Sequence, residues 1–377
     1  MTQTTPCPIL HFSFELGKQN WKLTFSDGSK KRMRAEIKAA DRKACLEAVA
    51  AAKKRFELPE NCKVVSCYEA GRDGFWIHRW LLSQQIENTI VDSASIEVNR
   101  RRRRAKTDRV DGEKLLLMLL RRMSGDNNVF KVVRVPNAED EDARRPHREL
   151  ERLAKERNGH TSRIESLLAL HGLCLQPNKY FLANLEKARC WDGSKLPLEL
   201  KQELIREYER LELVKTQMRE MEKARAERLA ALDESTEDNA QTRMFKLVAH
   251  LMRLRGIKDS AWVLVAEFFG WRKFKNRRQV GGLSGLTGTP YNSGESEREQ
   301  GISKAGNRRV RTLMVELAWC WLRYQPNSKI SKWYAAKYQS GTKRNRRVGI
   351  VAVARQLLVA LWRYAEHGEI PEGATLK

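Results

Sequence analysis

Five consecutive arginines stand directly before two aspartates that lie one helical turn apart. The basic tract consists of Arg100, Arg101, Arg102, Arg103 and Arg104, with Lys106 close behind. Asp108 and Asp111 have the spacing of residues that share one helix face. Two such carboxylates can hold a divalent cation, and the basic tract supplies counter-charge for a phosphodiester backbone. The segment therefore predicts nucleic-acid chemistry, although taken alone it also fits an exposed helix start behind a solvated arginine run.

Two more carboxylates lie upstream in strand-like segments. Residues 9–18 and 21–25 alternate and turn like a β-hairpin, which places Glu15 within or at the end of the first strand. Residues 63–68 form a second β-rich run. Glu69 follows at its carboxyl end, where open α/β sheets commonly build their sites.

The order of the expected elements is a strand hairpin, a helix, a strand, a helix, a short strand at residues 89–92, and a helix. Acids stand on the first strand, at a later strand tip and on the closing helix. This is the arrangement of an RNase H-like nuclease core. Such a core gathers sequence-distant carboxylates around one or two metal ions, which stabilise both oxygens of an in-line displacement. Each acid alone also fits an ordinary surface carboxylate.

The charge balance favours a polyanionic partner. The chain has 72 lysines and arginines against 47 aspartates and glutamates, a formal net charge of +25. No apolar run reaches the roughly 18 residues of a membrane helix, and we see no secretory signal. The seven scattered cysteines form neither a zinc motif nor a disulfide framework. We therefore expect free thiols in a reducing cytoplasm, with the protein at the nucleoid, and no membrane partner.

The middle of the chain predicts a helical arm. Apolar residues recur at threes and fours from His147 to a glycine stop at Gly172, and a second helix is expected from Pro197 to about Leu232. Arg225 and Arg228 interrupt its heptad seam, so an antiparallel helical hairpin or partial coiled coil is favoured over a long dimer zipper. The acidic stretch 136–146 is expected to be the linker. The domains are therefore 1–135, 136–240 and 241–377.

A second chemical centre is expected near the carboxyl terminus. Residues 254–261 resemble the loop of a helix-hairpin-helix, whose glycine lets backbone N–H groups approach a phosphate. Residues 281–294 are so rich in glycine that we expect a shaped loop. After it, Lys304, Asn307, Arg308 and Arg311 surround the start of an apolar helix, which is suited to cradle phosphate. A serine there could attack a phosphodiester; by composition alone, phosphate binding without covalent chemistry is the simpler interpretation.

Three segments carry a family resemblance. The strings AKTDRVDGEKL, HRELERLAKERNGHTSRIESLLALHGL and GLSGLTGTPYNSGESEREQGISKAGNRRVRTLMVELA resemble the DEDD transposases of insertion-sequence family one-hundred-ten. The resemblance extends from about Ile9 to Gly368, and its two best motifs lie far apart in the chain. It implies a RuvC-like domain that binds magnesium, or manganese in its place, through Glu15, Glu69, Asp108 and Asp111.

The resemblance also implies a nucleophile. The family's catalytic serine is matched by Ser293 in Asn292-Ser293-Gly294, with Ser296 and Ser284 as substitutes. Two positions depart from the family pattern: Glu15 stands where an aspartate is usual, and Glu295 where many relatives have glycine. The Glu15 side chain is longer by one methylene, so the reach of that metal ligand differs from the family pattern.

The function implied by this resemblance is a transposase, that is, a DNA recombinase guided by RNA. A structured noncoding bridge RNA would pair with donor and target DNA, and strands would exchange through a covalent serine–DNA intermediate. The acids and the serine would meet between subunits of a homo-oligomer, a dimer or tetramer. Two other classes stay open: a RuvC-like nuclease of branched DNA without a covalent step, and an inactive, basic nucleic-acid-binding protein.

Overall fold

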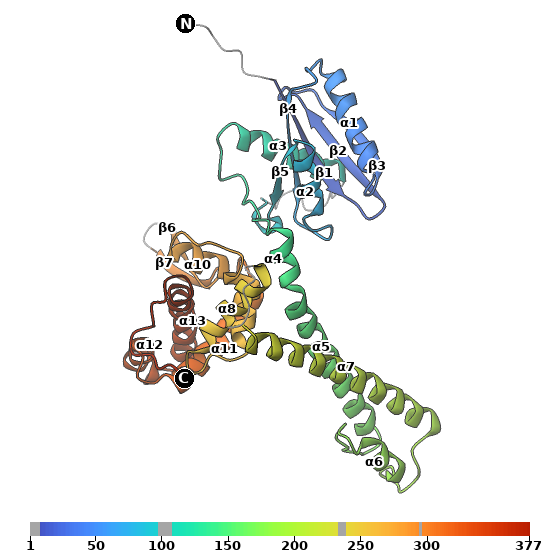
Figure 1. Ribbon diagram of the computed structural model, residues 1–377, viewed down its shortest axis with the longest axis vertical. Helices are drawn as coiled ribbons and strands as arrows, with labels where there is room; N and C mark the ends of the chain where they lie inside the picture. Colours follow the sequence, from blue (N-terminus) through green and yellow to red (C-terminus); the bar gives the residue numbers. More distant parts are fainter. Residues whose placement is uncertain (1–7, 97–107, 233–238, 294–295) are drawn as a thin grey trace. The chain divides into compact units, whose positions relative to one another are not determined.

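The computed structural model describes residues 8–96, 108–232, 239–293 and 296–377 (Figure 1). Side chains at 94, 108–111, 290–293 and 296–300 also lie outside the description. The chain divides into two compact units, Met1–Val135 and Pro136–Lys377. The expected boundary at 240/241 lies inside the second unit.

The first unit is built on a five-stranded mixed sheet in the order β3-β2-β1-β4-β5. The strands are β1 Ile9–Leu16, β2 Asn20–Ser26, β3 Met33–Lys38, β4 Lys63–Glu69 and β5 Glu87–Val91. β1 and β2 pair antiparallel, as the hairpin pattern predicted, and β3 pairs antiparallel with β2, whereas β1, β4 and β5 are parallel. The carboxyl ends of these three parallel strands therefore meet at one edge of the sheet.

Strand alternation separates the two faces of this sheet. Phe12 and Phe14 pack with the buried side of α1 Arg42–Arg55 and with α2 Trp76–Ser83. The residues between them point to the other face, where α3 Asp108–Met123 packs against Val65, Cys67 and Val91. A short 3₁₀ turn at Ser93–Ser95 follows β5. The helix α3 is thus placed on one side of the sheet and α1 and α2 on the other.

The second unit begins with an ordered helix rather than the linker expected at 136–146. Asn137 caps α4 Ala138–Ala143 by accepting from the Asp140 N–H, and the acids of its first turn suit the positive end of the helix dipole. Arg144 is buried where α4 passes into α5 Arg145–Ala169. The acidic composition suggested solvent exposure, but the segment docks on the core of its own unit through Ala143.

The arm is a helical hairpin, as predicted. α5 packs along α7 Leu198–Ala230, with α6 Phe181–Lys187 at the far end (Figure 1). Buried Leu204, Leu211 and Val214 form the seam on α7. The buried carboxylate of Glu207 accepts a hydrogen bond from His160 Nδ1 and pairs with the guanidinium groups of Arg163 and Arg210. Arg225 leaves the seam because its guanidinium lies 4.1 Å from the ring centre of Trp262.

The remainder of the second unit is a helical core. Its helices are α8 Ala240–Met252, α9 Ser260–Leu264, α10 Arg277–Ser284, α11 Arg308–Tyr324, α12 Lys329–Tyr334 and α13 Lys343–His367, with π-helical turns at Val265–Phe269 and Ala335–Gln339. α8 and α9 flank the predicted hairpin loop, where Gly256 has a φ of +92°. The C-terminal tail pairs with this loop through Leu254 and Leu376.

Two expectations about this core need correction or qualification. Residues 281–294 are not one loop: Gly281 and Gly282 lie inside α10, and β6 Gly288–Ser293 pairs with β7 Ser296–Ile302. The glycine content suggested a loop, but this segment forms a capped helix: Asn276 caps the start of α10, and Gly285, in the left-handed region, ends it. α13 is long and apolar enough to span a membrane by length and composition, but half of its apolar window is buried inside the protein.

Candidate functional site

The first candidate site lies at the carboxyl edge of the parallel strands. Glu15 is the residue before the end of β1, and Glu69 is the last residue of β4. β1 and β4 pair in register up to Phe14 and Tyr68, so the two glutamates follow at neighbouring positions on adjacent strands. Glu15 is half-buried and Glu69 is exposed.

Both glutamates belong to the face of the sheet that α3 covers. The Ser13 hydroxyl donates to the Gly112 carbonyl at 2.8 Å, and the Cys67 thiol lies 3.8 Å from the Leu115 carbonyl. Residues two apart on a strand point to the same side. Glu15 therefore shares the face of Ser13, and Glu69 shares the face of Cys67.

The first half of α3 crosses β1 and β4 close to these strand ends. Gly112 lies over Ser13 of β1, and Leu115 lies over Cys67 of β4, which is the register partner of Ser13. Gly112 allows the close approach, since a Cβ there would stand 3.2 Å from Thr24 Oγ1.

The structure brings the two glutamates onto adjacent strands and places the helix of the two aspartates on the same face of the sheet. Asp108 is the first residue of α3, and Asp111 directly precedes the seated Gly112. Their side chains lie outside the description, so the metal assignment stays a prediction. No three potential metal ligands lie together among the residues whose side chains are described, and these two aspartates are not among those residues. Carboxylate oxygens are the ligand type that magnesium prefers.

The second candidate site is the β6–β7 hairpin of the C-terminal core. Ser293 ends β6 and stands opposite Ser296 in the register. Their side chains are outside the description. The substitute nucleophile Ser284 is placed differently: it is fully buried, and its hydroxyl donates to the Gly281 carbonyl at 2.8 Å. A phosphodiester has no access to Ser284 in this structure.

The loop after the hairpin docks tightly on the end of α10. The Lys304 N–H donates to the Gly285 carbonyl, and the Asn307 N–H donates to the Leu283 carbonyl at 2.8 Å. A Cβ on Gly285 would stand 1.9 Å from the Ala305 carbonyl oxygen, and one on Gly306 would stand 2.1 Å from that of Leu283. Both glycines also have positive φ. Only glycine fits this contact without a shift of the backbone.

The four predicted phosphate-binding residues of this loop divide into two groups. Asn307 caps α11 through Oδ1, and its amide donates to the Glu267 carbonyl. Arg311 donates to the carbonyls of Ser284 and Ala305. These two side chains have internal structural partners. Lys304 and Arg308 are exposed beside the helix start. The tract from Arg100 to Lys106 lies outside the described residues.

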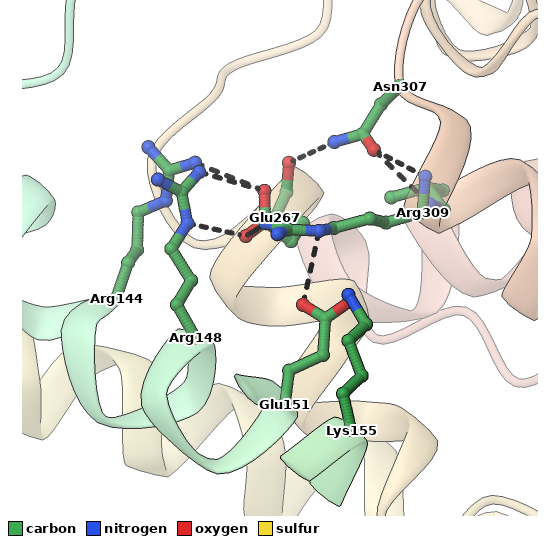
Figure 2. A network of polar contacts seen from close by, with 8 residues as sticks. Arg144, Arg148, Glu151, Lys155, Glu267, Asn307 and Arg309 are labelled. Carbon is green, nitrogen blue, oxygen red and sulfur yellow. Dashed lines mark hydrogen bonds and ion pairs between the residues drawn. The ribbon is translucent and has the colours of Figure 1, made fainter. Parts of the chain in front are cut away.

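A buried acid that the sequence analysis did not single out organises this region. Glu267 is 3% exposed and lies in the π-helical turn of the core (Figure 2). Its carboxylate accepts from Arg148 at 2.8 and 3.2 Å, from Arg144 at 3.2 Å and from Arg309 at 3.2 Å. Arg309 also contacts Glu151. The sequence signal for Glu267 is a single carboxylate within the apolar segment 262–269, because a buried carboxylate requires a partner.

Electrostatics keep this carboxylate ionised. Burial alone would raise the pKa of Glu267, but the hydrogen bonds and charge of Arg148, with the charges of Arg144 and Arg309, lower it to about 2. Burial lowers the pKa of the neighbouring His147. The cluster thereby joins the first turn of α5 to the start of α11, which carries Arg308.

Comparison with known proteins decides the family. The chain is 41% identical over 373 residues to a Sinorhizobium fredii protein named "Putative transposase y4rJ", covering 97% of this chain and 94% of that relative. The model of the transposase IS116/IS110/IS902 family matches residues 248–335. The chain belongs to the IS110 family of transposases. A second relative of this transposase, "Putative transposase y4qE" of the same organism, is 34% identical over 142 residues, 32% of this chain and 36% of the relative.

Membership makes this transposase an enzyme of DNA recombination that binds DNA, in agreement with the resemblance stated above. The matched segment of the transposase runs from α8 to the turn after α12. It includes Glu267, the hairpin with Ser293, and the start of α11.

Proposed function

We propose that this transposase cuts and joins DNA strands through a covalent bond to Ser293, with Glu15, Glu69, Asp108 and Asp111 holding a divalent cation. The acid set is supported by the seating of α3: the Ser13 hydroxyl, two residues before Glu15, donates to the carbonyl of Gly112, which directly follows Asp111. The strand order β3-β2-β1-β4-β5 agrees with the RNase H-like, RuvC-like fold expected from the sequence.

The covalent step is a balanced transesterification. The Ser293 oxygen forms a bond to phosphorus, the bond from phosphorus to one strand oxygen breaks, and the hydroxyl proton passes to the freed strand end. The phosphodiester energy is kept, so the joining step can reverse the cleavage without ATP. Lys304 and Arg308 are exposed near the hairpin, where their charges can stabilise the developing negative oxygens. A bound magnesium or manganese ion supplies further positive charge to the phosphate.

The position of Ser293 supports its role over that of Ser284. Ser293 ends a strand of a short hairpin and stands opposite Ser296 in the register. Ser284 is buried and bonded inside α10. Ser296 is the register partner of Ser293 and stays the closest substitute.

The remaining parts of the proposal concern partners. We infer that a structured noncoding RNA guides the protein to donor and target DNA in the bacterial cytoplasm and that the protein acts as a homo-oligomer. The net charge of +25 supports polyanion binding. Copurification of RNA with the Ser293→Ala protein tests the guide, and light scattering of the purified complex tests the oligomer. Recombination of DNA by protein that carries no RNA would refute the proposed guidance by RNA.

Trapping a protein–DNA adduct tests the covalent mechanism. Wild-type protein with donor DNA is expected to form an adduct on the peptide that contains Ser293, and Ser293→Ala is expected to form none. Ser296→Ala is the matched control, because it removes the same hydroxyl from the facing strand. Metal-dependent nicks without an adduct would instead identify a hydrolytic nuclease. Neither nicks nor adduct would identify a binding protein without activity.

The acid set has a separate test. Asp108→Asn and Asp111→Asn are expected to abolish cleavage while the protein keeps its melting temperature, since the changes preserve side-chain size. Glu113→Gln is the control on the same helix, where the acid pairs with Arg34. Normal recombination by either aspartate variant would refute the metal assignment.

A further inference from the structure

A groove of about 810 Å³ lies on the helical core, and its lining includes no residue of the serine hairpin. It runs between the second half of α11, α12 and the first turns of α13. Its lining combines Trp319, Leu322 and Tyr334 with Lys343, Arg346 and Arg347. One wall is therefore aromatic and apolar, and the other is cationic.

The aromatic wall exposes a large ring that the fold does not use. Trp319 is 52% exposed, whereas its neighbours Ala318 and Trp321 are buried in the core. No ring contact, hydrogen bond or ion pair joins the Trp319 side chain to another described residue. An indole offers a flat apolar face of large area, and leaving it in water forgoes the stabilisation that burial would give.

The cationic wall is unusual for a helix start. α13 begins with Lys343, Arg344, Arg346 and Arg347, all exposed, and its first turn has no acid. Positive charges oppose the positive end of the helix dipole, so they do not stabilise this helix. None of the four side chains forms an ion pair with a described residue. In the same unit, Arg148 and Arg309 bind acids.

The two walls are held in fixed positions by tight packing. Gly349 of α13 faces Tyr338 and Tyr334, and a Cβ there would stand 2.5 Å from Tyr338 Cγ and 2.9 Å from Tyr334 Cε2. The rings of Tyr334 and Tyr338 stack with centres 6.0 Å apart. This clamp fixes the start of α13 against α12. The cations at the start of α13 therefore face a ligand with little reorganisation of the backbone that carries them.

The ligand that fits both walls has negative charge at regular intervals and flat apolar faces. A duplex keeps its bases stacked inside, so it can offer only phosphates to these walls. A single strand offers both, since aromatic rings stack on its bases and cations follow its backbone. A transposase creates such strands when it cuts DNA.

We propose that this groove binds a single-stranded segment of the DNA substrate, with a base stacked on Trp319 and phosphates held by Lys343, Arg346 and Arg347. The assignment rests on family membership and on the groove, not on the proposed serine chemistry or the guide RNA. The groove would hold a strand freed by cleavage and keep it from reannealing before it is joined.

Binding of labelled oligonucleotides to full-length protein tests the stacking. The probe is a labelled DNA strand of about twelve nucleotides, within the usual site sizes. Trp319→Ala is expected to weaken its binding by about tenfold, and Trp319→Phe to keep most of the affinity, as stacking on one base predicts. Trp191→Ala is the matched control, because Trp191 is 81% exposed at the far end of the arm. Unchanged affinity of Trp319→Ala would overturn the proposal.

Two further arms separate the alternatives. Affinity for a duplex of the same length is expected to be the same in Trp319→Ala and wild type; an equal loss on both probes would overturn the single-strand assignment. An RNA strand of the same sequence tests whether the groove prefers ribose or deoxyribose. An affinity for this RNA more than tenfold higher than for the DNA would overturn the assignment to DNA. The double variant Arg346→Ala/Arg347→Ala is expected to reduce the slope of log affinity against log salt concentration by about 1.4. Each lost contact to a single-strand phosphate accounts for roughly 0.7 of this slope.

Crosslinking locates the strand directly. A strand carrying 5-bromodeoxyuridine is expected to crosslink to the peptide that contains Trp319. Crosslinks that map only to other peptides would overturn the site. Because Ser293→Ala removes the proposed nucleophile, crosslinking in that variant keeps this test independent of cleavage.

Discussion

Arg148 Nε and Glu267 Oε1 lie 2.8 Å apart, and Arg148 Nη2 lies 3.2 Å from Glu267 Oε2. The guanidinium thus grips the carboxylate with two parallel bonds, the strongest geometry for this pair. It joins a helix of the arm to a core turn 119 residues further along the chain. Figure 2 shows Arg144 and Arg309 completing the contact, so one buried acid orders the arm base and the start of α11 together.

Glu267→Gln is expected to lower the free energy of unfolding by about 3 kcal/mol, because removing one partner leaves buried arginine charge uncompensated. The control is Glu151→Gln at a more exposed position of the same network, where a loss of about 0–1 kcal/mol is expected. Chemical denaturation measures both. Equal effects of the two changes would show that Glu267 does not hold the cluster together.

The same carboxylate should give stability a dependence on acid pH. The pKa of Glu267 falls from its ordinary 4.5 to about 2 in the folded protein. Its contribution is therefore fully present above pH 4.5, and it is lost as the pH falls through about 2. Wild-type stability should drop more steeply than that of Glu267→Gln across this window. Parallel curves in denaturant titrations at several pH values would contradict the assignment.

Gly285→Ala is expected to destabilise the C-terminal core by at least about 2 kcal/mol, since an alanine there must adopt a strained backbone. Its Cβ would also meet the Ala305 carbonyl. Gly282→Ala is the matched control: it lies in the same helix with no atom within 4 Å of the added Cβ, and alanine favours a helix by up to about 1 kcal/mol. Thermal unfolding of both variants measures the difference, and similar melting temperatures would refute the close contact.

Ser13→Ala is expected to cost about 1 kcal/mol, because it removes the hydrogen bond that seats Gly112 on β1. We also expect it to reduce DNA cleavage while DNA binding stays unchanged, since Asp108 and Asp111 would lose their fixed placement. Ser83→Ala, at an exposed serine of α2, is the control. Full cleavage activity in Ser13→Ala would show that this contact does not position the acids.

Replacing Arg101 and Arg103 by alanine is expected to weaken nucleic-acid binding for every sequence tested, because backbone phosphates carry no base identity. The salt dependence of binding should flatten by about one phosphate contact for each arginine. Lys30→Ala with Lys31→Ala removes the same charge from the turn between β2 and β3 and serves as the control. A loss confined to one sequence would favour base readout instead.

Local pattern alone determined several elements of this protein. The alternation of Phe12, Ser13, Phe14 and Glu15 predicted a strand with the glutamate within it or at its end, because side chains of a strand alternate with period two. The threes and fours of the apolar residues in the arm predicted both of its long helices. The positions of the four acids on strand ends and a helix start followed from the same patterns.

Other features depended on tertiary contacts. β3 was not expected, because Met33–Lys38 is an edge strand whose side chains are half-buried or exposed, and such a strand carries little hydrophobic signal. The acidic stretch before Pro146 looked like a linker, but it docks as α4 beside the core.

The contacts that gather the candidate sites join residues far apart in the chain. Ser13 meets Gly112 across 99 residues, and Arg144 meets Glu267 across 123. No local propensity encodes such partners. Tertiary packing brings these partners together. A buried carboxylate needs cationic partners, and a glycine lets a helix backbone lie close to the strand that it covers. The sequence by itself determined which residues are candidates for the chemistry, and the tertiary structure decided which distant segments come together.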